Sequence, residues 1–169
     1  MKYPIGIQQF EKLREEDWIY VDKTEHIYNL VQGGTCYFLS RPRRFGKSML
    51  LSTLDAYFQG KKHLFKGLAI EQLETEWAEH AVLHLDLNAE KYTAPEDLTN
   101  ILDTYLREWE EKYESTEKEN PSLSQRFRSV IRAAKQKTGR NVVVLVDEYD
   151  KPMLQAIDNE ELQTEFRNA

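Results

Sequence analysis

Two stretches of the chain have the apolar pattern of buried strands. Residues 141–148 contain a continuous run of β-branched and apolar side chains that ends in two carboxylates, Asp147 and Glu148. Residues 81–87 form a second apolar stretch. Continuous apolar runs of this length are typical of strands that are buried on both faces of a parallel sheet. The pattern therefore predicts a parallel sheet at the centre of the fold.

Helices are predicted between these strands, where apolar side chains recur every three or four residues. The expected helices cover residues 22–34, 49–58, 94 to a charged tail at 108–120, 122–138 and 153–169. A third apolar run, residues 36–39, completes the order β-α-β-α-α-β. The crossovers are long enough for parallel pairing, so the fold class is predicted to be α/β, a parallel sheet flanked by helices.

A basic segment with a Gly-Lys-Ser ending, Ser40 to Ser48, lies between the run 36–39 and the next helix. A phosphate at a helix N-terminus requires free backbone N–H groups, a residue without Cβ at the close approach and a cation. Gly46 supplies the approach and Lys47 the cation, while the Ser48 hydroxyl suits a phosphate-bound Mg²⁺. We expect nucleotide contacts from Arg41, Arg43, Arg44, Phe45, Gly46, Lys47, Ser48 and Met49.

The segment departs from the standard pattern Gly-x4-Gly-Lys-Ser/Thr in one position. Arg41 stands five residues before Gly46, where the pattern has glycine. Pro42 favours an extended backbone at Arg41, which a residue other than glycine adopts without strain. The alternative interpretation of the segment alone is a basic strand-to-helix turn with an accidental Gly-Lys-Ser.

The carboxylates at the end of residues 141–148 indicate a functional site, because adjacent acids at the tip of a buried strand repel each other unless a cation or water compensates. Alternation along the strand predicts that Asp147 and Glu148 point to different sides. We assign Asp147 to the metal and Glu148 to the attacking water, so that Glu148 and Lys47 are the predicted catalytic residues. A solvated strand end is the alternative.

Three motifs together resemble the AAA-ATPase-like family of bacterial proteins, from near Pro4 to the end of the chain. They are residues 20–24 (YVDKT), 41–48 (RPRRFGKS) and 147–152 (DEYDKP). The resemblance implies a P-loop NTPase fold of the AAA type. It also implies a further strand that lies in space between the strand before residues 41–48 (the Walker A motif) and the strand that ends in Asp147 (the Walker B strand). It also implies that Lys47 and Ser48 contact phosphate and Mg²⁺, that Asp147 and Glu148 form the acidic pair, and that an arginine at position 41 is normal.

The predicted organisation is a lead-in, residues 1–34, that packs on a P-loop core, residues 35–169. A P-loop ATPase needs at least one more strand with a polar residue near the γ-phosphate. We therefore expect the chain to be an incomplete N-terminal portion of a longer protein, cut after the Walker B strand and the following helix. The resemblance implies that a nuclease-like domain of the PD-(D/E)XK type follows, and any nucleic-acid contact is assigned to that domain.

Charge, cysteine content and hydropathy restrict the possible partners and cellular compartment of the protein. The 169 residues carry a net charge of −6, which argues against a protein that coats nucleic acid. A single cysteine, Cys36, excludes an intramolecular disulfide, and no apolar run approaches membrane-spanning length. These features predict a cytoplasmic protein without membrane contact, and they leave its oligomeric state open. We expect His84 and Asp86 to be structural, although Asp86 stands near enough to a strand end to approach the site.

Three functions remain open on the sequence. The first is an ATP-binding and ATP-hydrolysing domain with Mg²⁺, whose turnover is expected of the intact protein more than of this chain alone. The second is a non-catalytic, nucleotide-gated scaffold for an attached nuclease-like domain. The third is a P-loop kinase of small molecules, which the acidic pair disfavours because a kinase must exclude the water that such a pair activates.

Overall fold

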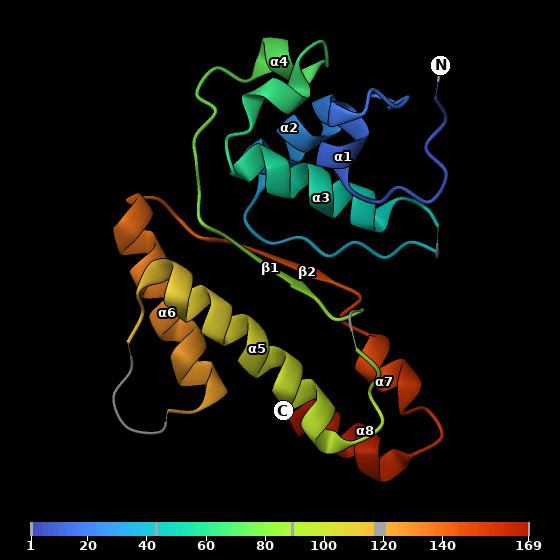
Figure 1. The fold of residues 1–169 in the computed structure, drawn as a ribbon, viewed down its shortest axis with the longest axis vertical. Coiled ribbons are helices and arrows are strands. Elements are labelled where there is room, and N and C mark those ends of the chain that lie inside the picture. Colours follow the sequence, from blue (N-terminus) through green and yellow to red (C-terminus); the bar gives the residue numbers. More distant parts are fainter. Residues whose placement is uncertain (1, 43, 89, 117–120, 169) are drawn as a thin grey trace. The chain divides into compact units, whose positions relative to one another are not determined.

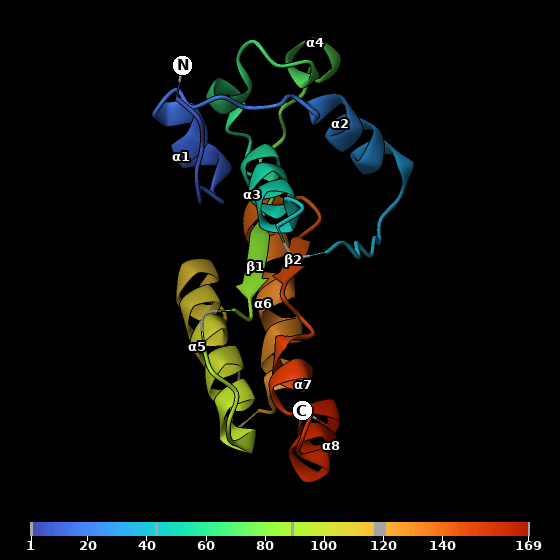
Figure 2. The ribbon, with the colours of Figure 1, turned by 90° about the vertical axis from the view of Figure 1, so that its right-hand side faces the viewer.

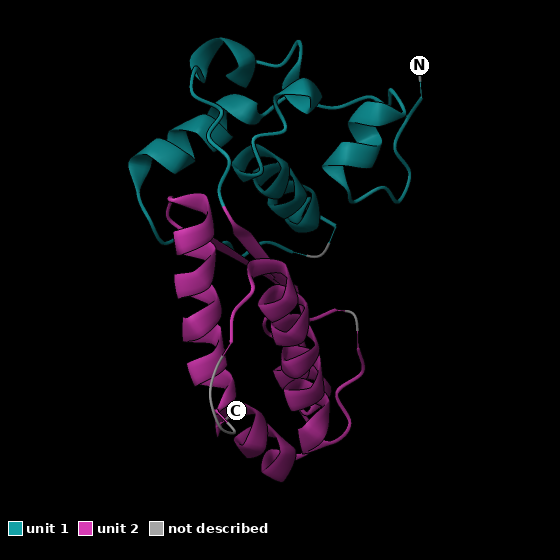
Figure 3. Ribbon diagram, turned by 60° about the vertical axis from the view of Figure 1, so that its left-hand side comes forward, with its two compact units in different colours: residues 1–80 teal, residues 81–169 magenta. Residues whose placement is uncertain are grey.

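The computed structural model describes residues 2–42, 44–88, 90–116 and 121–168 (Figure 1). These residues form two compact units, residues 1–80 and residues 81–169 (Figure 3). Each unit is described by itself. The predicted division separates a lead-in, residues 1–34, from a P-loop core, residues 35–169. It concerns function and not compactness, and it stays a prediction.

The first unit is helical. Phe10 is fully buried in its core, with its ring centroid 4.9 Å from that of Phe65, and Phe65 lies 5.1 Å from Trp77 in the same way. The first of these contacts joins positions that are 55 residues apart in the sequence. The helices are α1 (Phe10–Glu15), α2 (Thr24–Gly33), α3 (Lys47–Phe58), the 3-10 helix η1 (Lys62–Phe65) and α4 (Ile70–Leu73).

The second unit contains the sheet. Strands β1 (Val82–Asp86) and β2 (Val143–Asp147) pair in parallel and lie side by side in both views (Figures 1 and 2). The register begins with Val82 opposite Val143 and ends with Asp86 opposite Asp147. The predicted α/β class with a parallel sheet is therefore confirmed. The helices of this unit are α5 (Pro95–Tyr113), α6 (Leu123–Thr138), α7 (Lys151–Gln155) and α8 (Glu160–Asn168).

Helices α5 and α6 pack on one face of this sheet, but they cover its two strands unequally. On β1, Leu83 is fully buried against a cluster that includes Leu106 of α5 and Val130 of α6. On β2, Val144 and Val146 keep 43% and 40% of their surface exposed. The apolar pattern of residues 141–148 thus predicted the strand correctly, but β2 is not fully buried on both faces.

The predicted strand at residues 36–39 is wrong. The structure gives these residues no strand, and Phe38 is 72% exposed. The Tyr37 hydroxyl donates a hydrogen bond to the carbonyl oxygen of Leu30, at 2.6 Å, and so holds the segment against the end of α2. A strand requires a neighbouring strand as well as apolar composition, and none of the described residues pairs with this segment.

The predicted C-terminal helix, residues 153–169, is two helices. Helix α7 ends at Gln155 and α8 begins at Glu160. The Oδ1 atom of Asn159 accepts a hydrogen bond from the N–H of Leu162 at 3.0 Å, the interaction by which an N-cap residue starts a helix. An asparagine that caps a new helix interrupts the old one, and this explains the difference.

Candidate functional site

The Gly-Lys-Ser segment leads directly into α3, as the sequence predicts. Gly46 is the N-cap residue of this helix, with φ 75° and ψ 24°. A Cβ atom built on Gly46 would meet no other atom within 4 Å. Glycine is therefore favoured here by the left-handed backbone, which costs other residues energy, and space around the residue plays no part in this structure.

The loop before Gly46 is open to solvent. Arg41, Arg44 and Phe45 are exposed, and Arg44 also has a left-handed backbone, with φ 67°. Arg43, which is among the predicted nucleotide contacts, lies outside the described residues. Positive side chains on an accessible loop are free to reach a bound anion, which is what the predicted contacts require.

Lys47, Ser48 and Met49 form the first turn of α3 and are half-buried. The first turn of any helix has backbone N–H groups without partners inside the helix, and its dipole favours negative charge. The side chains of Lys47 and Ser48 form no ion pair or hydrogen bond with another described residue. The structure therefore brings a cation, a hydroxyl and a helix N-terminus together in one accessible place.

Helix α3 is fixed in the first unit by its second turn. The Ser52 hydroxyl accepts a hydrogen bond of 2.8 Å from the N–H of Phe10, the residue that starts α1. Thr53 is fully buried, and its hydroxyl donates to the carbonyl oxygen of Met49 at 2.7 Å. Burial raises the pKa of the Tyr20 hydroxyl, which hydrogen bonds with Thr53. Through these contacts the second turn of α3 holds the first turn in place.

The motif at residues 20–24 has a structural role. The carboxylate of Asp22 accepts hydrogen bonds from the N–H of Thr24 at 2.9 Å and from the N–H of Ala69 at 2.7 Å. The buried Thr24 hydroxyl accepts from the N–H of Ile70 at 3.1 Å. The motif thus ties the start of α2 to the start of α4. Partial burial acts to raise the pKa of Asp22, but the hydrogen bonds from Thr24 and Ala69, together with the charge of Arg14, outweigh it and lower that pKa.

The acidic pair lies at the carboxyl end of β2. Asp147 is the last residue of the strand and only 7% exposed, and its Oδ1 atom accepts a hydrogen bond of 3.0 Å from the N–H of Glu148. Glu148 lies beyond the strand, with a left-handed φ of 52°. Strand alternation therefore does not determine where Glu148 points, contrary to the prediction. The left-handed turn redirects the chain at this residue.

A third carboxylate stands beside the pair. Asp86 is the last residue of β1 and is opposite Asp147 in the register. Its Oδ1 atom accepts a hydrogen bond of 2.8 Å from the N–H of Asn88. The side chain therefore forms a local turn, as expected for a structural residue. Tyr105 of α5 holds the backbone of Asp86, with its hydroxyl 3.3 Å from both the nitrogen and the oxygen.

Lys151 connects the loops that follow the two strands, and this role was not predicted. Its ammonium group donates to the carbonyl oxygens of Asn88, at 2.6 Å, and Glu90, at 2.8 Å. It also lies 5.9 Å from the ring centroid of Tyr92, whose pKa burial raises to about 12. The only sequence signal was that Lys151 belongs to the DEYDKP motif. A lysine that satisfies two loop carbonyls stabilises the segment next to Asp147 and Glu148.

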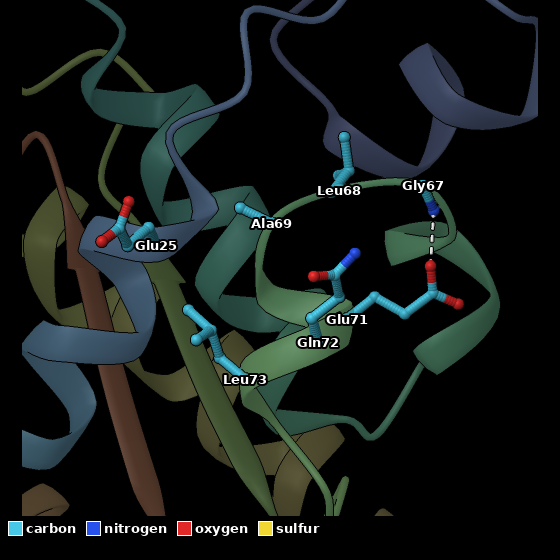
Figure 4. A pocket seen from close by; sticks show the side chains of 7 residues that line it. All are labelled: Glu25, Gly67, Leu68, Ala69, Glu71, Gln72 and Leu73. Atoms are coloured by element: carbon cyan, nitrogen blue, oxygen red, sulfur yellow. Dashed lines mark hydrogen bonds between the residues drawn. The ribbon is translucent and has the colours of Figure 1, made fainter.

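The phosphate-loop candidates lie in the first unit and the carboxylates in the second. None of the residues that line the pocket drawn in Figure 4 belongs to either group. The pocket has a volume of about 430 Å³ and lies between α2 and α4 in the first unit. The N–H of Gly67 donates to the Glu71 carboxylate at 2.7 Å on its border. Its lining residues are Glu25, Gly67, Leu68, Ala69, Glu71, Gln72 and Leu73.

The described residues contain no group of three or more His, Cys, Asp or Glu side chains that could hold a metal ion. Mg²⁺ is typically bound by one or two protein oxygens together with phosphates and water. The Ser48 hydroxyl and the Asp147 carboxylate are donors of this kind, so these residue types fit the ion. Of the helices that the structure describes, none combines the length and the apolar character of a membrane span.

Comparisons with known proteins identify a family. A family model described as "Predicted AAA-ATPase" matches residues 4–169. A curated protein of Azotobacter chroococcum mcd 1, "Uncharacterized protein in vnfD 5'region", is 42% identical over 171 residues. The match covers 99% of this chain and 32% of that protein, so the chain spans about a third of the relative's length. No solved structure matches. The chain belongs to the predicted AAA-ATPase family.

Proposed function

We propose that this chain is the ATP-binding P-loop domain of an AAA-like ATPase. The observation that carries the proposal is the left-handed Gly46 directly before Lys47 and Ser48, in the accessible first turn of α3. A Gly-Lys-Ser sequence at a helix N-terminus also agrees with the alternative, a basic turn with an accidental Gly-Lys-Ser. Its occurrence in a member of the predicted AAA-ATPase family favours the phosphate loop over an accidental turn.

In this proposal the chain's own groups bind the triphosphate. The backbone N–H groups of the first turn of α3 donate to phosphate oxygens, and Lys47 neutralises the charge of the terminal phosphates. The exposed Arg41 and Arg44 add charge at the mouth of the loop. A triphosphate carries several negative charges, so these groups together account for affinity without any contact to the base.

Hydrolysis is assigned to the acidic pair. Ser48 and Asp147 would hold Mg²⁺, which supplies electrostatic stabilisation of the phosphate charge when it is bound. Glu148 orients water and accepts its proton. The left-handed backbone of Glu148 supports this assignment, because strained conformations of non-glycine residues concentrate at functional sites.

The activity of the whole protein is a further proposal, since the chain spans about a third of its relative. We infer a cytoplasmic bacterial protein in which a nuclease-like domain follows the ATPase domain. A nucleotide-gated scaffold without turnover is the second candidate, and it differs from the first only in what Glu148 does. An oligomer is compatible with both candidates.

The test is binding of a fluorescent ATP analogue to the chain with and without Mg²⁺. Lys47→Ala should weaken binding about 10- to 100-fold, because charge-assisted hydrogen bonds contribute roughly 1.5–3 kcal/mol. Lys62→Ala is the matched control, since Lys62 is an exposed lysine of the same unit outside the loop. Equal affinity of wild type and Lys47→Ala would refute the phosphate loop.

Turnover separates the candidates. Phosphate release from ATP in the protein of full length, lost in Glu148→Gln with binding unchanged, would support the ATPase. Binding without release, with Glu148→Gln behaving as wild type, would support the scaffold. Transfer of phosphate to an added small molecule, without release to water, would indicate the kinase.

A further inference from the structure

Helix α6 belongs to a segment without acidic residues. Residues 121–146 contain six arginines and lysines and no aspartate or glutamate, in a chain with 29 acidic residues. The unit that contains α6, residues 81–169, has 12 basic and 18 acidic residues, so its net charge is −6. The positive charge of α6 is therefore a local feature that opposes the charge of its surroundings.

Two of these six cations are neutralised inside the unit. Arg126 bonds to Glu110 of α5 at 2.7 Å and also pairs with Asp103. Lys137 pairs with Glu114 at 2.7 Å. Arg126 holds α6 to α5, and Lys137 holds α6 to the residue that ends α5. Both cations therefore have a structural role.

Three other cations have no acidic partner among the described residues. Arg128 and Arg132 are exposed and form no ion pair or hydrogen bond with any residue that the structure describes. Lys135 is exposed and donates only to the neutral amide oxygen of Asn141, at 3.1 Å. Residues at i, i+4 and i+7 lie on one face of a helix. These three side chains, which we call the α6 strip, therefore form one positive row over about 10 Å of helix.

The surface around the α6 strip is polar. Ser124, Gln125 and Gln136 are its exposed neighbours on α6. The large apolar side chains of α6 are covered, since Val130 is fully buried and Phe127 packs against Trp109. A protein interface normally depends on aromatic or apolar groups at its centre, and a single strand of nucleic acid on exposed aromatic rings for stacking. Exposed groups of neither kind are present on α6.

We propose that the α6 strip binds the phosphate backbone of duplex nucleic acid without reading its sequence. Arginine forks match phosphate oxygens, and hydroxyl and amide side chains are common phosphate contacts. Duplex DNA offers about three phosphates of one strand over 10 Å of its axis, which equals the number of cations. The negative charge of the rest of the unit keeps this binding weak and strongly dependent on salt.

The experiment measures fluorescence anisotropy of a labelled 20-base-pair DNA duplex with the complete chain at several salt concentrations. Three phosphate contacts predict that log K falls with log salt with a slope of about −2.7, so affinity falls roughly 40-fold between 50 and 200 mM salt. The double variant Arg128→Gln/Arg132→Gln keeps one of the three contacts, so its slope should be about −0.9. Its affinity for the duplex at 50 mM salt should be at least 10-fold lower than that of wild type. Circular dichroism and a thermal melt check that the variant is folded.

The matched control is Lys91→Gln/Arg167→Gln, which removes two exposed cations from the same unit. Its slope and affinity should stay near those of wild type, and so should those of Lys47→Ala. Absence of duplex binding at 50 mM salt overturns the proposal, as does an equal loss in the control. Loss in Lys47→Ala alone would assign the duplex to the phosphate loop instead. Competition by polyglutamate as strong as by unlabelled duplex would indicate an acidic protein partner and also overturn it.

Discussion

Asp86 and Asp147 are opposite each other at the carboxyl ends of β1 and β2. Register partners of a parallel pair leave the sheet on the same face, so the two carboxylates lie on one face at the same edge of the sheet. Asp147 is only 7% exposed. Like charges directly opposite each other in a sheet are destabilising, so we expect this pair of carboxylates to lower the stability of the fold.

Removing either charge should stabilise the fold, but only one change should affect the nucleotide. Asp86→Asn keeps the acceptor for the N–H of Asn88, and we expect it to raise the free energy of unfolding by about 0.5 kcal/mol with Mg²⁺-dependent ATP binding unchanged. Asp147→Asn should be stabilised likewise yet lose the Mg²⁺ dependence. Urea denaturation and analogue binding measure the two effects. If Asp86→Asn also loses Mg²⁺ dependence, Asp86 belongs to the site.

Two glycines allow the loop backbone to be tested apart from its chemistry. Gly46 and Gly67 have φ of 75° and 78°, and a Cβ atom at either position would meet nothing within 4 Å. Alanine at either position should therefore lower the free energy of unfolding by a similar amount, about 1 kcal/mol. Only Gly46→Ala should weaken ATP binding, because only Gly46 precedes the phosphate loop's Lys47. Equal affinities of the two variants would contradict the loop geometry.

Glu148 combines a strained backbone with the proposed catalytic carboxylate. Glycine adopts its φ of 52° without penalty, so Glu148→Gly should raise the free energy of unfolding by up to about 1 kcal/mol. Glu148→Gln keeps the strain and should leave stability unchanged. Turnover by the intact protein should be lost in both variants. A stable Glu148→Gly that still releases phosphate would show that this carboxylate is dispensable.

Asp22 predicts a dependence of stability on acid pH. Its pKa is lowered in the fold, so its contribution is complete above the unfolded pKa of about 3.9 and is lost as the pH falls through the lower, folded pKa. Asp22→Asn lacks the second oxygen that faces the N–H of Ala69 and should cost about 1 kcal/mol at pH 7. Denaturation at several pH values measures the gap in the free energy of unfolding between wild type and Asp22→Asn. This gap should be constant above pH 5.

Below pH 4 the gap between wild type and Asp22→Asn should narrow, because protonated Asp22 makes the same contacts as asparagine. Glu25→Gln is the control, since Glu25 is an exposed acid three residues further along. Its difference from wild type should show no such change. A gap that stays constant to pH 2 would indicate that the carboxylate charge of Asp22 does not contribute.

Local patterns in the sequence predicted those parts of the fold that depend on near neighbours. Helices α3, α5 and α6 follow from apolar spacing and from end signals such as Gly139, which ends α6 with φ 68°. Strands β1 and β2 follow from apolar runs. The sequence also indicated the residues of the candidate site, because only a few residue types bind phosphate or a metal ion. These residues are Gly46, Lys47, Ser48, Asp147 and Glu148.

Relationships between distant segments were decided by the tertiary structure. Residues 36–39 have the composition of a strand but no strand to pair with among the described residues, and Glu148 leaves the strand geometry that alternation assumed. The register that sets Asp86 beside Asp147 and the contacts of Lys151 join positions about 60 residues apart. Periodicity and capping are properties of a short window of sequence. Pairing, register and long-range hydrogen bonds depend on which segments meet when the chain folds, and no short window contains that information.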